Sequence, residues 1–441
     1  MSLVTDSPVH SSSNDEFAAF LDASLDSGSS EEAEDGNDDL ETQRIKRCKV
    51  EKLENVEGVL GSTSQTSSLK QTVEASIKKD LCTHPGSFGD MCILCGQRLA
   101  EESGVTFGWL QNDEIARLRN TDMKNLLRHK KLYLVLDLDH TLLNSTQLIH
   151  ITPEEEYLKA QTDSLQDVSG GSLFMLDFMH MMTKLRPIVH TFLKEASEMF
   201  EMYIYTMGDR AYALEMAKLL DPQREYFSAR VISRDDGTHK HQKGLDVVLG
   251  QESAVLILDD TENAWTKHKD NLILMERYHF FASSCHQFGF SCKSLSELKS
   301  DESETEGALA SVLKVLKQIH KMFFDVLEDN LVDRDVRQVL KTIRKEVLKG
   351  CKIVFSRVFP TKFPADNHHL WRMAENLGAT CATELDSSVT HVVSMDAATE
   401  ISRWALKQNK FLVHTGWLEA ANYFWQKQPE ENFPVNQTKS Q

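Results

Sequence analysis

Five short apolar runs in the middle of the chain are each followed by polar or small residues. The first run, Leu132–Leu136, precedes Asp137 and Asp139 in the stretch LYLVLDLDHTLLNS. A continuous apolar run of this length is typical of a strand that is buried on both faces. Between the runs lie helical patterns such as residues 210–220, where apolar residues recur three and four positions apart. This alternation predicts a parallel sheet with helices on its faces, whose other four strands lie at residues 202–205, 231–232, 255–258 and 272–275.

Polar side chains follow four of these predicted strands. Ligands of such sheets bind beyond the carboxyl ends of the strands, so these side chains are expected to face one site. Buried carboxylates are costly unless they are paired or bind a metal, so a positive charge is expected at the end of the first strand. The residues concerned are Asp137, Asp139, Thr206, Ser233, Arg234, Asp259 and Asp260.

Two regions stand apart from this alternating pattern. Residues 145–182 are too long for an ordinary connection, and inserts of this length in compact domains are usually functional or disordered. The acidic stretch SDESETEG at 300–307 indicates a linker, and a helical pattern follows it to about residue 348. Residues 349–441 have a strand and helix pattern of their own, which predicts a separate α/β domain.

The N-terminal part of the chain is strongly acidic. Residues 1–43 hold twelve Asp and Glu side chains and no Lys or Arg, and so supply most of the net charge of −18. Such a composition buries too little apolar surface to fold, so residues 1–78 are expected to be disordered. The basic cluster RIKRCKVEK at 44–52 is typical of a nuclear import signal, although such runs also occur as solvated linkers. The rest of the chain shows no basic stripe, and no direct contact with nucleic acid is expected.

Four side chains that could bind zinc, Cys82, His84, Cys92 and Cys95, occur in the lead-in segment 79–130. Four such ligands suit a closed tetrahedral Zn²⁺ site, although the C-x-H gap is tighter than the usual ligand spacing. The alternative is a reduced loop with incidental cysteines. The chain has no signal peptide and no apolar run of membrane-spanning length, which predicts an intracellular protein without a membrane partner.

The residues that follow the strands are suited to phosphoryl transfer. Mg²⁺ typically binds one or two carboxylates together with phosphate oxygens, and the four aspartates named above supply the carboxylates. Thr206 and Lys243 offer a hydroxyl group and a positive charge to an oxyanion. An aspartate also serves as a nucleophile in enzymes that form an aspartyl-phosphate. The combination predicts a phosphate-transferring site rather than a simple turn.

The stretch DLDHTLL resembles the D-x-D-x-T/V signature of the haloacid-dehalogenase (HAD) superfamily. The stretches TKLRPIVHTFL, YIYTMGDRAYA, ISRDD, QKGLDVV and LDDTENAW are similar to its FCP/SCP branch, the phosphatases of the RNA polymerase II C-terminal repeat domain. Gly378 and Trp417 resemble marker residues of a BRCT domain, and the most similar group is the plant C-terminal-domain-phosphatase-like proteins with a terminal BRCT domain. The resemblance implies a HAD-like Rossmannoid parallel sheet in an FCP1-like phosphatase domain at 131–299, a helical segment within 300–348 and a BRCT domain at 349–441.

The resemblance also implies a role for each matching residue. Asp137 would attack phosphorus and bind Mg²⁺. Asp139 would protonate the leaving serine oxygen, later activate water, and bind the metal through its backbone carbonyl. Asp260 would complete the metal ligands, with Mn²⁺ or Co²⁺ as substitutes for Mg²⁺. The remaining roles are phosphate binding by Thr206 and Lys243, orientation of Lys243 by Asp259, and substrate contacts near the pocket by Arg186, Arg234 and Asp259.

The activity implied by the resemblance is Mg²⁺-dependent hydrolysis of phosphoserines of the RNA polymerase II repeat domain by a nuclear enzyme that regulates transcription. The BRCT domain would bind transcription factors, and Arg357 after Ser356, where phosphate-binding members have Gly, favours protein docking. Two departures from the family concern His140, where many members have Glu, and DDTENAW, which lacks the usual Arg and Asp near Trp265. The alternative function is a catalytically weak scaffold that binds phosphoproteins.

Overall fold

The computed structural model describes residues 112–436, together with the strands β1 (Ser87–Phe88) and β2 (Met91–Cys92), which pair antiparallel. The expected disordered region 1–78, with its basic cluster, lies outside the described residues. Short gaps in the description fall at 166–167, 169, 240, 291, 326–330, 332–333 and 361–362.

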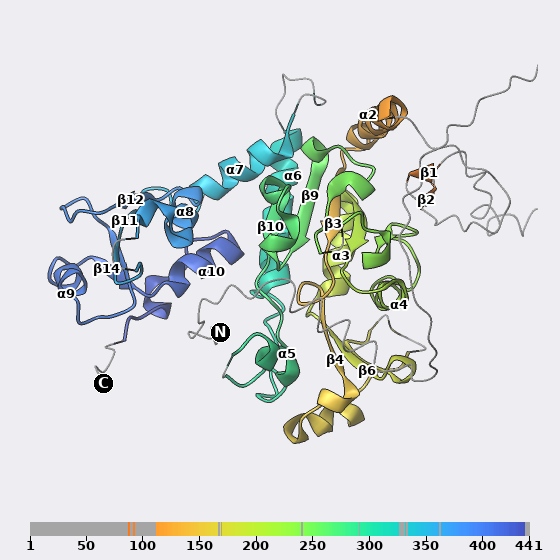
Figure 1. The fold of residues 1–441 in the computed structure, drawn as a ribbon, viewed down its shortest axis with the longest axis horizontal. Coiled ribbons are helices and arrows are strands. Elements are labelled where there is room, and N and C mark those ends of the chain that lie inside the picture. The colour runs from red at the N-terminus through yellow and green to blue at the C-terminus, as the bar shows by residue number, and fades with distance from the viewer. Residues whose placement is uncertain are drawn as a thin grey trace, which may run out of the picture. The chain divides into compact units, whose positions relative to one another are not determined.

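The central element is a five-stranded parallel sheet with the strand order β10-β9-β3-β7-β8, of which Figure 1 labels β10, β9 and β3. Its middle strand, β3, is apolar and buried along its whole length, and Val135 pairs with Ile257 on one side and Tyr203 on the other. The parallel sheet predicted from the five apolar runs is therefore confirmed. The strands are β3 (Leu132–Leu136), β7 (Phe200–Tyr205), β8 (Val231–Ile232), β9 (Val255–Asp259) and β10 (Leu272–Leu274).

The sheet separates two hydrophobic layers, because successive residues of a strand point to opposite faces. On β3, Leu132, Leu134 and Leu136 enter one apolar cluster, whereas Tyr133 and Val135 enter the other. Helix α2 (Asn112–Arg128) contributes to both clusters, and the helices that contribute to the first are α3 (Val189–Met199), α4 (Arg210–Leu220), α6 (Ala308–Phe324) and α7 (Val336–Glu346).

The insert after the first strand forms a small antiparallel sheet rather than a loop. Apolar side chains of this insert, including Leu173 and Met182, share a cluster with Phe280 and Phe281, which precede the short helix α5 (Ala282–Gln287). The insert is therefore anchored to the segment after β10. Its strands, in the order β4-β6-β5, are β4 (Leu143–Gln147), β5 (Leu173–Leu176) and β6 (Met181–Leu185).

Helices α6 and α7 belong to the same hydrophobic core as the central sheet. Leu316 and Ile319 of α6 and Val336 of α7 are fully buried in that core. The acidic stretch before α6, which the sequence indicated as a linker, is also anchored, because the Glu302 carboxylate accepts a hydrogen bond from Arg186 at 2.6 Å. Glu302 and the helices α6 and α7 thus pack with the central sheet, which the exposed, acidic stretch at 300–307 did not reveal.

The C-terminal residues form a four-stranded parallel sheet with the order β12-β11-β13-β14. Trp417 is fully buried in the hydrophobic core of this sheet and its helices. Gly378 has a φ of +93°, and a Cβ atom there would lie 1.8 Å from the carbonyl oxygen of Lys345, so the position requires glycine. The elements are β11 (Lys352–Ser356), α8 (His369–Asn376), β12 (Thr380–Ala382), β13 (His391–Ser394), α9 (Glu400–Lys407), β14 (Phe411–Val413) and α10 (Gly416–Phe424).

The predicted zinc site cannot be compared with described side chains. Only the backbone of Cys92 is described, in β2, whereas Cys82, His84 and Cys95 lie outside the described residues. The zinc site therefore stays a prediction. None of the described helices combines the length and the apolar composition needed to cross a bilayer.

Candidate active site

The carboxyl ends of neighbouring parallel strands hold the predicted site residues. Asp137 directly follows β3, Thr206 directly follows β7, and Asp259 is the last residue of β9. The parallel pairing of these strands brings their ends to one edge of the sheet. Lys243 comes from the loop between β8 and β9, where its N–H donates to the carbonyl of Ala264 at 2.9 Å. The structure thus brings together residues that are more than a hundred positions apart in the sequence.

Three carboxylates form the acidic centre of this edge. One oxygen from each of Asp137, Asp259 and Asp260 lies within 4.8 Å of the others, and no other such group occurs among the residues that the structure describes. Asp137 and Asp259 are buried, and Asp260 is partly buried. Hard cations such as Mg²⁺ bind carboxylate oxygens, so these residues fit the metal expected from the sequence.

Lys243 links two of the three carboxylates. Its buried Nζ atom donates to Oδ1 of Asp137 at 2.5 Å and to Oδ2 of Asp259 at 2.6 Å. Burial opposes the charge of this ammonium group, but Asp137 and Asp259 outweigh that effect and raise the pKa of Lys243 above its ordinary value. Lys243 therefore carries a positive charge beside Asp137, where an oxyanion would need one.

Asp259 and Asp260 are also held by neighbouring donors. The indole N–H of Trp265 donates to Oδ2 of Asp259 at 2.8 Å. Thr261 stands where the family pattern has Arg, and it donates its N–H to Asp259 at 2.8 Å and its hydroxyl to Asp260 at 3.1 Å. Both carboxylates are therefore held in place although DDTENAW departs from the family pattern. The buried Trp265 contributes to the site by its hydrogen bond to Asp259.

Burial and a neighbouring cation shift the pKa values of the aspartates in opposite directions. Burial raises the pKa of Asp137 and the pKa of Asp139 above their ordinary values, because the charged form loses its water. Burial would also raise the pKa of Asp260, but Nε of Arg277 lies 2.6 Å from its Oδ2. The positive charge of Arg277 outweighs burial, so the pKa of Asp260 lies below its ordinary value. Arg277 thus keeps one carboxylate ionised for a cation. Arg277 belongs to no recognisable motif, and its only signal in the sequence is its place after the fifth predicted strand.

Thr206 and Asp139 are in direct contact. The fully buried Thr206 donates its hydroxyl to Oδ2 of Asp139 at 3.4 Å and accepts a hydrogen bond from the N–H of Gly208 at 3.0 Å. The other carboxylate oxygen of Asp139 accepts a hydrogen bond from the hydroxyl of Tyr212 at 2.5 Å. Tyr212 was not singled out from the sequence, although it lies in the same YIYTMGDRAYA stretch as Thr206.

The two arginines that the resemblance assigned to the substrate differ in their surroundings. Arg234 lies just after β8 and donates its N–H to the carbonyl of Gly208 at 3.0 Å, which places it beside the Thr206 loop. Its side chain is partly exposed. Arg186 is 1% exposed. Its guanidinium donates to both carboxylate oxygens of Glu302 and to the carbonyl oxygens of His140, Thr141 and Glu276.

These contacts change the interpretation of Arg186. A guanidinium group has five N–H donors, and here Nε, Nη1 and Nη2 are all directed to protein acceptors. The geometry therefore favours a structural role for Arg186, in which it ties the turn after Asp139 to the segment that precedes α6, over the substrate contact expected from the sequence.

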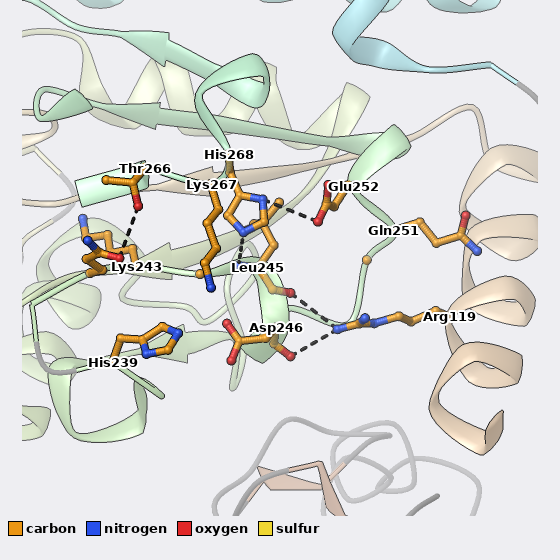
Figure 2. Close-up of a pocket in the computed structure, with 13 residues that line it drawn as sticks. Arg119, His239, Lys243, Leu245, Asp246, Gln251, Glu252, Thr266, Lys267 and His268 are labelled. Atoms are coloured by element: carbon orange, nitrogen blue, oxygen red, sulfur yellow. Dashed lines mark hydrogen bonds and ion pairs between the residues drawn. The ribbon is translucent and has the colours of Figure 1, made fainter. Parts of the chain in front are cut away.

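A pocket of about 440 Å³ opens beside Lys243 (Figure 2). Its lining comes from the loop that carries Lys243, from residues 266–268 and from Arg119 of α2. Arg119 donates to the carbonyl oxygen of Asp246 at 3.1 Å and so helps to fix that loop. The side chain of Lys267 points into the opening (Figure 2). The site thus lies beside a cavity with a mixed-charge lining.

Family matches and similar proteins of known name point to the same kind of site, that of a phosphatase. Residues 132–326 match the family described as NLI interacting factor-like phosphatase, and residues 344–421 match the BRCA1 C Terminus (BRCT) domain. The whole chain is 65% identical to RNA polymerase II C-terminal domain phosphatase-like 4 of Arabidopsis thaliana and covers 99% of that protein. It is 41% identical to RNA polymerase II C-terminal domain phosphatase-like 3, also of Arabidopsis thaliana, over 74% of this chain and 27% of that protein.

The fold is also similar to a solved structure. The structure of Fcp1, described as an essential RNA polymerase II CTD phosphatase, aligns with 73% of this chain and 100% of that chain, with a TM-score of 0.57 and 25% sequence identity. The resemblance drawn from the sequence, the α/β fold class and the BRCT domain are therefore confirmed. The chain belongs to the family of RNA polymerase II C-terminal domain phosphatase-like proteins, and it is a phosphatase.

Proposed function

We propose that this nuclear phosphatase hydrolyses phosphoserines in the C-terminal repeat domain of RNA polymerase II, with Mg²⁺ and through an aspartyl-phosphate. The observation that carries the mechanism is the position of Lys243, which joins Asp137 to Asp259 beside Asp260. The substrate is supported by the names of the relatives, including the full-length relative from Arabidopsis thaliana.

In this proposal Asp137 is the nucleophile. Its carboxylate oxygen forms a bond to phosphorus while the bond from phosphorus to the serine oxygen breaks, which gives the aspartyl-phosphate. Lys243 and Thr206 stabilise the negative charge on the other phosphate oxygens. Mg²⁺, held by the carboxylates of Asp137 and Asp260 and by the backbone carbonyl of Asp139, would neutralise further charge on those oxygens.

Asp139 is the proposed acid and base. Its carboxyl group gives a proton to the leaving serine oxygen in the first step. The resulting carboxylate then takes a proton from the water that attacks the aspartyl-phosphate, which releases phosphate and restores Asp137. Oδ2 of Asp139 is the oxygen that contacts Thr206, a proposed phosphate ligand, and is therefore the oxygen suited to the leaving group.

The proposal predicts metal-dependent hydrolysis of repeat peptides phosphorylated at serine 2 or serine 5. Removal of Mg²⁺ by EDTA should lower the rate at least about a hundredfold, because a bound metal contributes several kcal/mol to the stabilisation of the transition state. Phosphate release is measured with EDTA, after Mg²⁺ is restored, and with Mn²⁺ or Co²⁺. Restored Mg²⁺ controls for loss of the fold.

The same measurement separates the phosphatase from the alternative of a catalytically weak scaffold. A scaffold would bind the phosphopeptides with little turnover in the presence of Mg²⁺. Turnover that EDTA leaves unchanged would contradict the metal-dependent mechanism. A preference for one peptide would define which serine is the substrate.

We propose further that the BRCT domain, which matches at 344–421, docks protein partners of transcription. Its removal by a stop after Lys349 should leave hydrolysis of a small aryl phosphate within about threefold of the full-length rate. Turnover of a long multi-repeat substrate should fall by roughly tenfold or more, because docking raises the effective concentration of substrate. Both substrates are assayed with both proteins, and circular dichroism verifies the fold of the truncated chain. Loss of small-substrate activity in a folded truncated protein would place the C-terminal domain in the catalytic unit.

A further inference from the structure

The hydroxyl group of Tyr212 makes a short hydrogen bond within the proposed catalytic group. It donates to Oδ1 of Asp139 at 2.5 Å, and the ring is 7% exposed. Thr206 contacts the other oxygen, Oδ2, at 3.4 Å. The two oxygens of Asp139 therefore have different partners: Tyr212 holds one, and the other faces the residue proposed to bind phosphate.

The backbone around Tyr212 fixes its ring against the phosphate-binding loop. Tyr212 lies in the first turn of α4, where its N–H donates to the side chain of the N-cap residue Asp209 at 2.8 Å. A Cβ atom at Gly208 would lie 2.5 Å from Cδ1 of Tyr212, so the ring occupies space that only glycine leaves open. Gly208 is also the residue whose N–H donates to Thr206. The ring, the loop and the hydroxyl of Thr206 are thus packed as one unit.

A second hydroxyl group orients the proton of Tyr212. The hydroxyl of Ser145 on β4 lies 3.0 Å from the hydroxyl of Tyr212 and 2.8 Å from that of Thr183 on β6. Oδ1 of Asp139 accepts a hydrogen bond whether the group is ionised or carries its proton on Oδ2, so the single proton of Tyr212 goes to Asp139 and Ser145 donates to Tyr212. The antiparallel insert therefore supports the position of Asp139 through these two hydroxyl groups.

We propose that Tyr212 is a positioning residue for proton transfer: it holds Oδ1 of Asp139 so that Oδ2 is aimed at the leaving serine oxygen. This inference rests on the proposed role of Asp139. Tyr212 keeps its own proton throughout, and the proton that reaches the serine oxygen comes from Asp139. A fixed carboxyl group transfers a proton more efficiently than one that samples several rotamers, because the reacting geometry is already present.

The test is Tyr212→Phe, which keeps the ring and removes only the hydroxyl group. Its kcat on a phosphoserine peptide should fall about tenfold, a part of the hundredfold or more that general acid catalysis contributes, with KM unchanged. Its kcat/KM on an activated aryl phosphate, which reports the first step and not the later attack of water, should change less than about twofold, because that leaving group needs little protonation. In an Asp139→Asn background, Tyr212→Phe should cause no further loss, because it acts through Asp139.

Tyr133→Phe is the matched control. Tyr133 is also buried and also donates to a carboxylate at 2.5 Å, that of Asp122, but it lies near the start of β3, away from the carboxyl ends of the strands. This variant should retain both activities.

The outcomes separate this inference from the role of Asp139. If Asp139→Asn lowers kcat/KM only for phosphoserine while Tyr212→Phe lowers it equally for both substrates or for neither, Tyr212 has no positioning role and Asp139 remains the acid. If Asp139→Asn lowers kcat/KM equally for both substrates, the acid assignment fails, and the inference about Tyr212 fails with it. A selective loss in Tyr212→Phe that disappears in the Asp139→Asn background supports both.

Discussion

Asp137→Asn should lower kcat for a phosphoserine peptide by at least about a thousandfold, because the substitution removes the attacking oxygen charge of the proposed nucleophile. It also removes one of the two carboxylates, those of Asp137 and Asp260, that would hold the metal. The amide has the same shape as the carboxylate, and Lys243 keeps its second partner, Asp259, at 2.6 Å. The variant should therefore remain folded, and its kcat is measured beside its melting temperature.

The free energy of unfolding of this variant should change little, because two effects of the substitution oppose each other. Burial raises the pKa of Asp137 above its ordinary value, so its charged form is less favourable in the folded protein than in the unfolded chain. A neutral amide removes that cost, but it leaves the buried Lys243 ammonium with one carboxylate, that of Asp259, instead of two. Asp270→Asn is the control, because it makes the same substitution at an exposed residue that pairs with Lys341 at the surface. It should keep the normal kcat. A variant at Asp137 that turns over the peptide at a tenth of the normal rate would show that another residue is the nucleophile.

The central sheet could be predicted because its strands are buried on both faces. In β3 every residue from Leu132 to Leu136 is buried, so the strand appears in the sequence as one apolar run with a polar end. The parallel pairing then follows from the alternation of strands and helices, and it places the polar ends together. Asp137, Thr206 and Asp259 could be proposed as one site for this reason, whereas Lys243, in the loop between β8 and β9, was proposed from its charge and the family resemblance.

The antiparallel insert could not be predicted in the same way. In β5 (Leu173–Leu176) and β6 (Met181–Leu185) the buried positions do not alternate with exposed ones, because Leu173, Phe174 and Leu176 are all buried. Without alternation, a short apolar segment does not show whether it is a strand or part of a helix. The sequence therefore indicated the length of the insert and not its structure.

The supporting residues of the site depend on contacts between distant positions. Tyr212 and Asp139 are 73 positions apart, and Arg277 reaches Asp260 from the segment after β10. Neither Tyr212 nor Arg277 is part of a short sequence motif, whereas the two aspartates of D-x-D lie two positions apart and are recognised together. Only the packing of α4 and the segment after β10 shows that these side chains meet the carboxylates.

Arg186→Leu should lower the free energy of unfolding by about 3–5 kcal/mol, the usual cost of removing one partner of a buried ion pair. The Arg186 side chain is fully buried and that of Glu302 is 18% exposed, so leucine would leave a mostly buried carboxylate without its cation. It would also leave the carbonyl groups of His140 and Thr141 without this donor. The melting temperature, measured by circular dichroism, should fall by at least about 6 °C.

Arg234→Leu is the matched control, because it removes the same charge from a partly exposed position beside the Thr206 loop. Its melting temperature should change by less than about 3 °C, while its KM for the phosphopeptide should rise, as a substrate contact requires. Arg186→Leu, assayed well below its melting temperature, should instead have a lower kcat and an unchanged KM. The lower kcat is expected because the turn directly after Asp139 becomes less rigid. An Arg186→Leu protein with normal stability and a raised KM would instead restore the substrate contact that the family resemblance implied for Arg186.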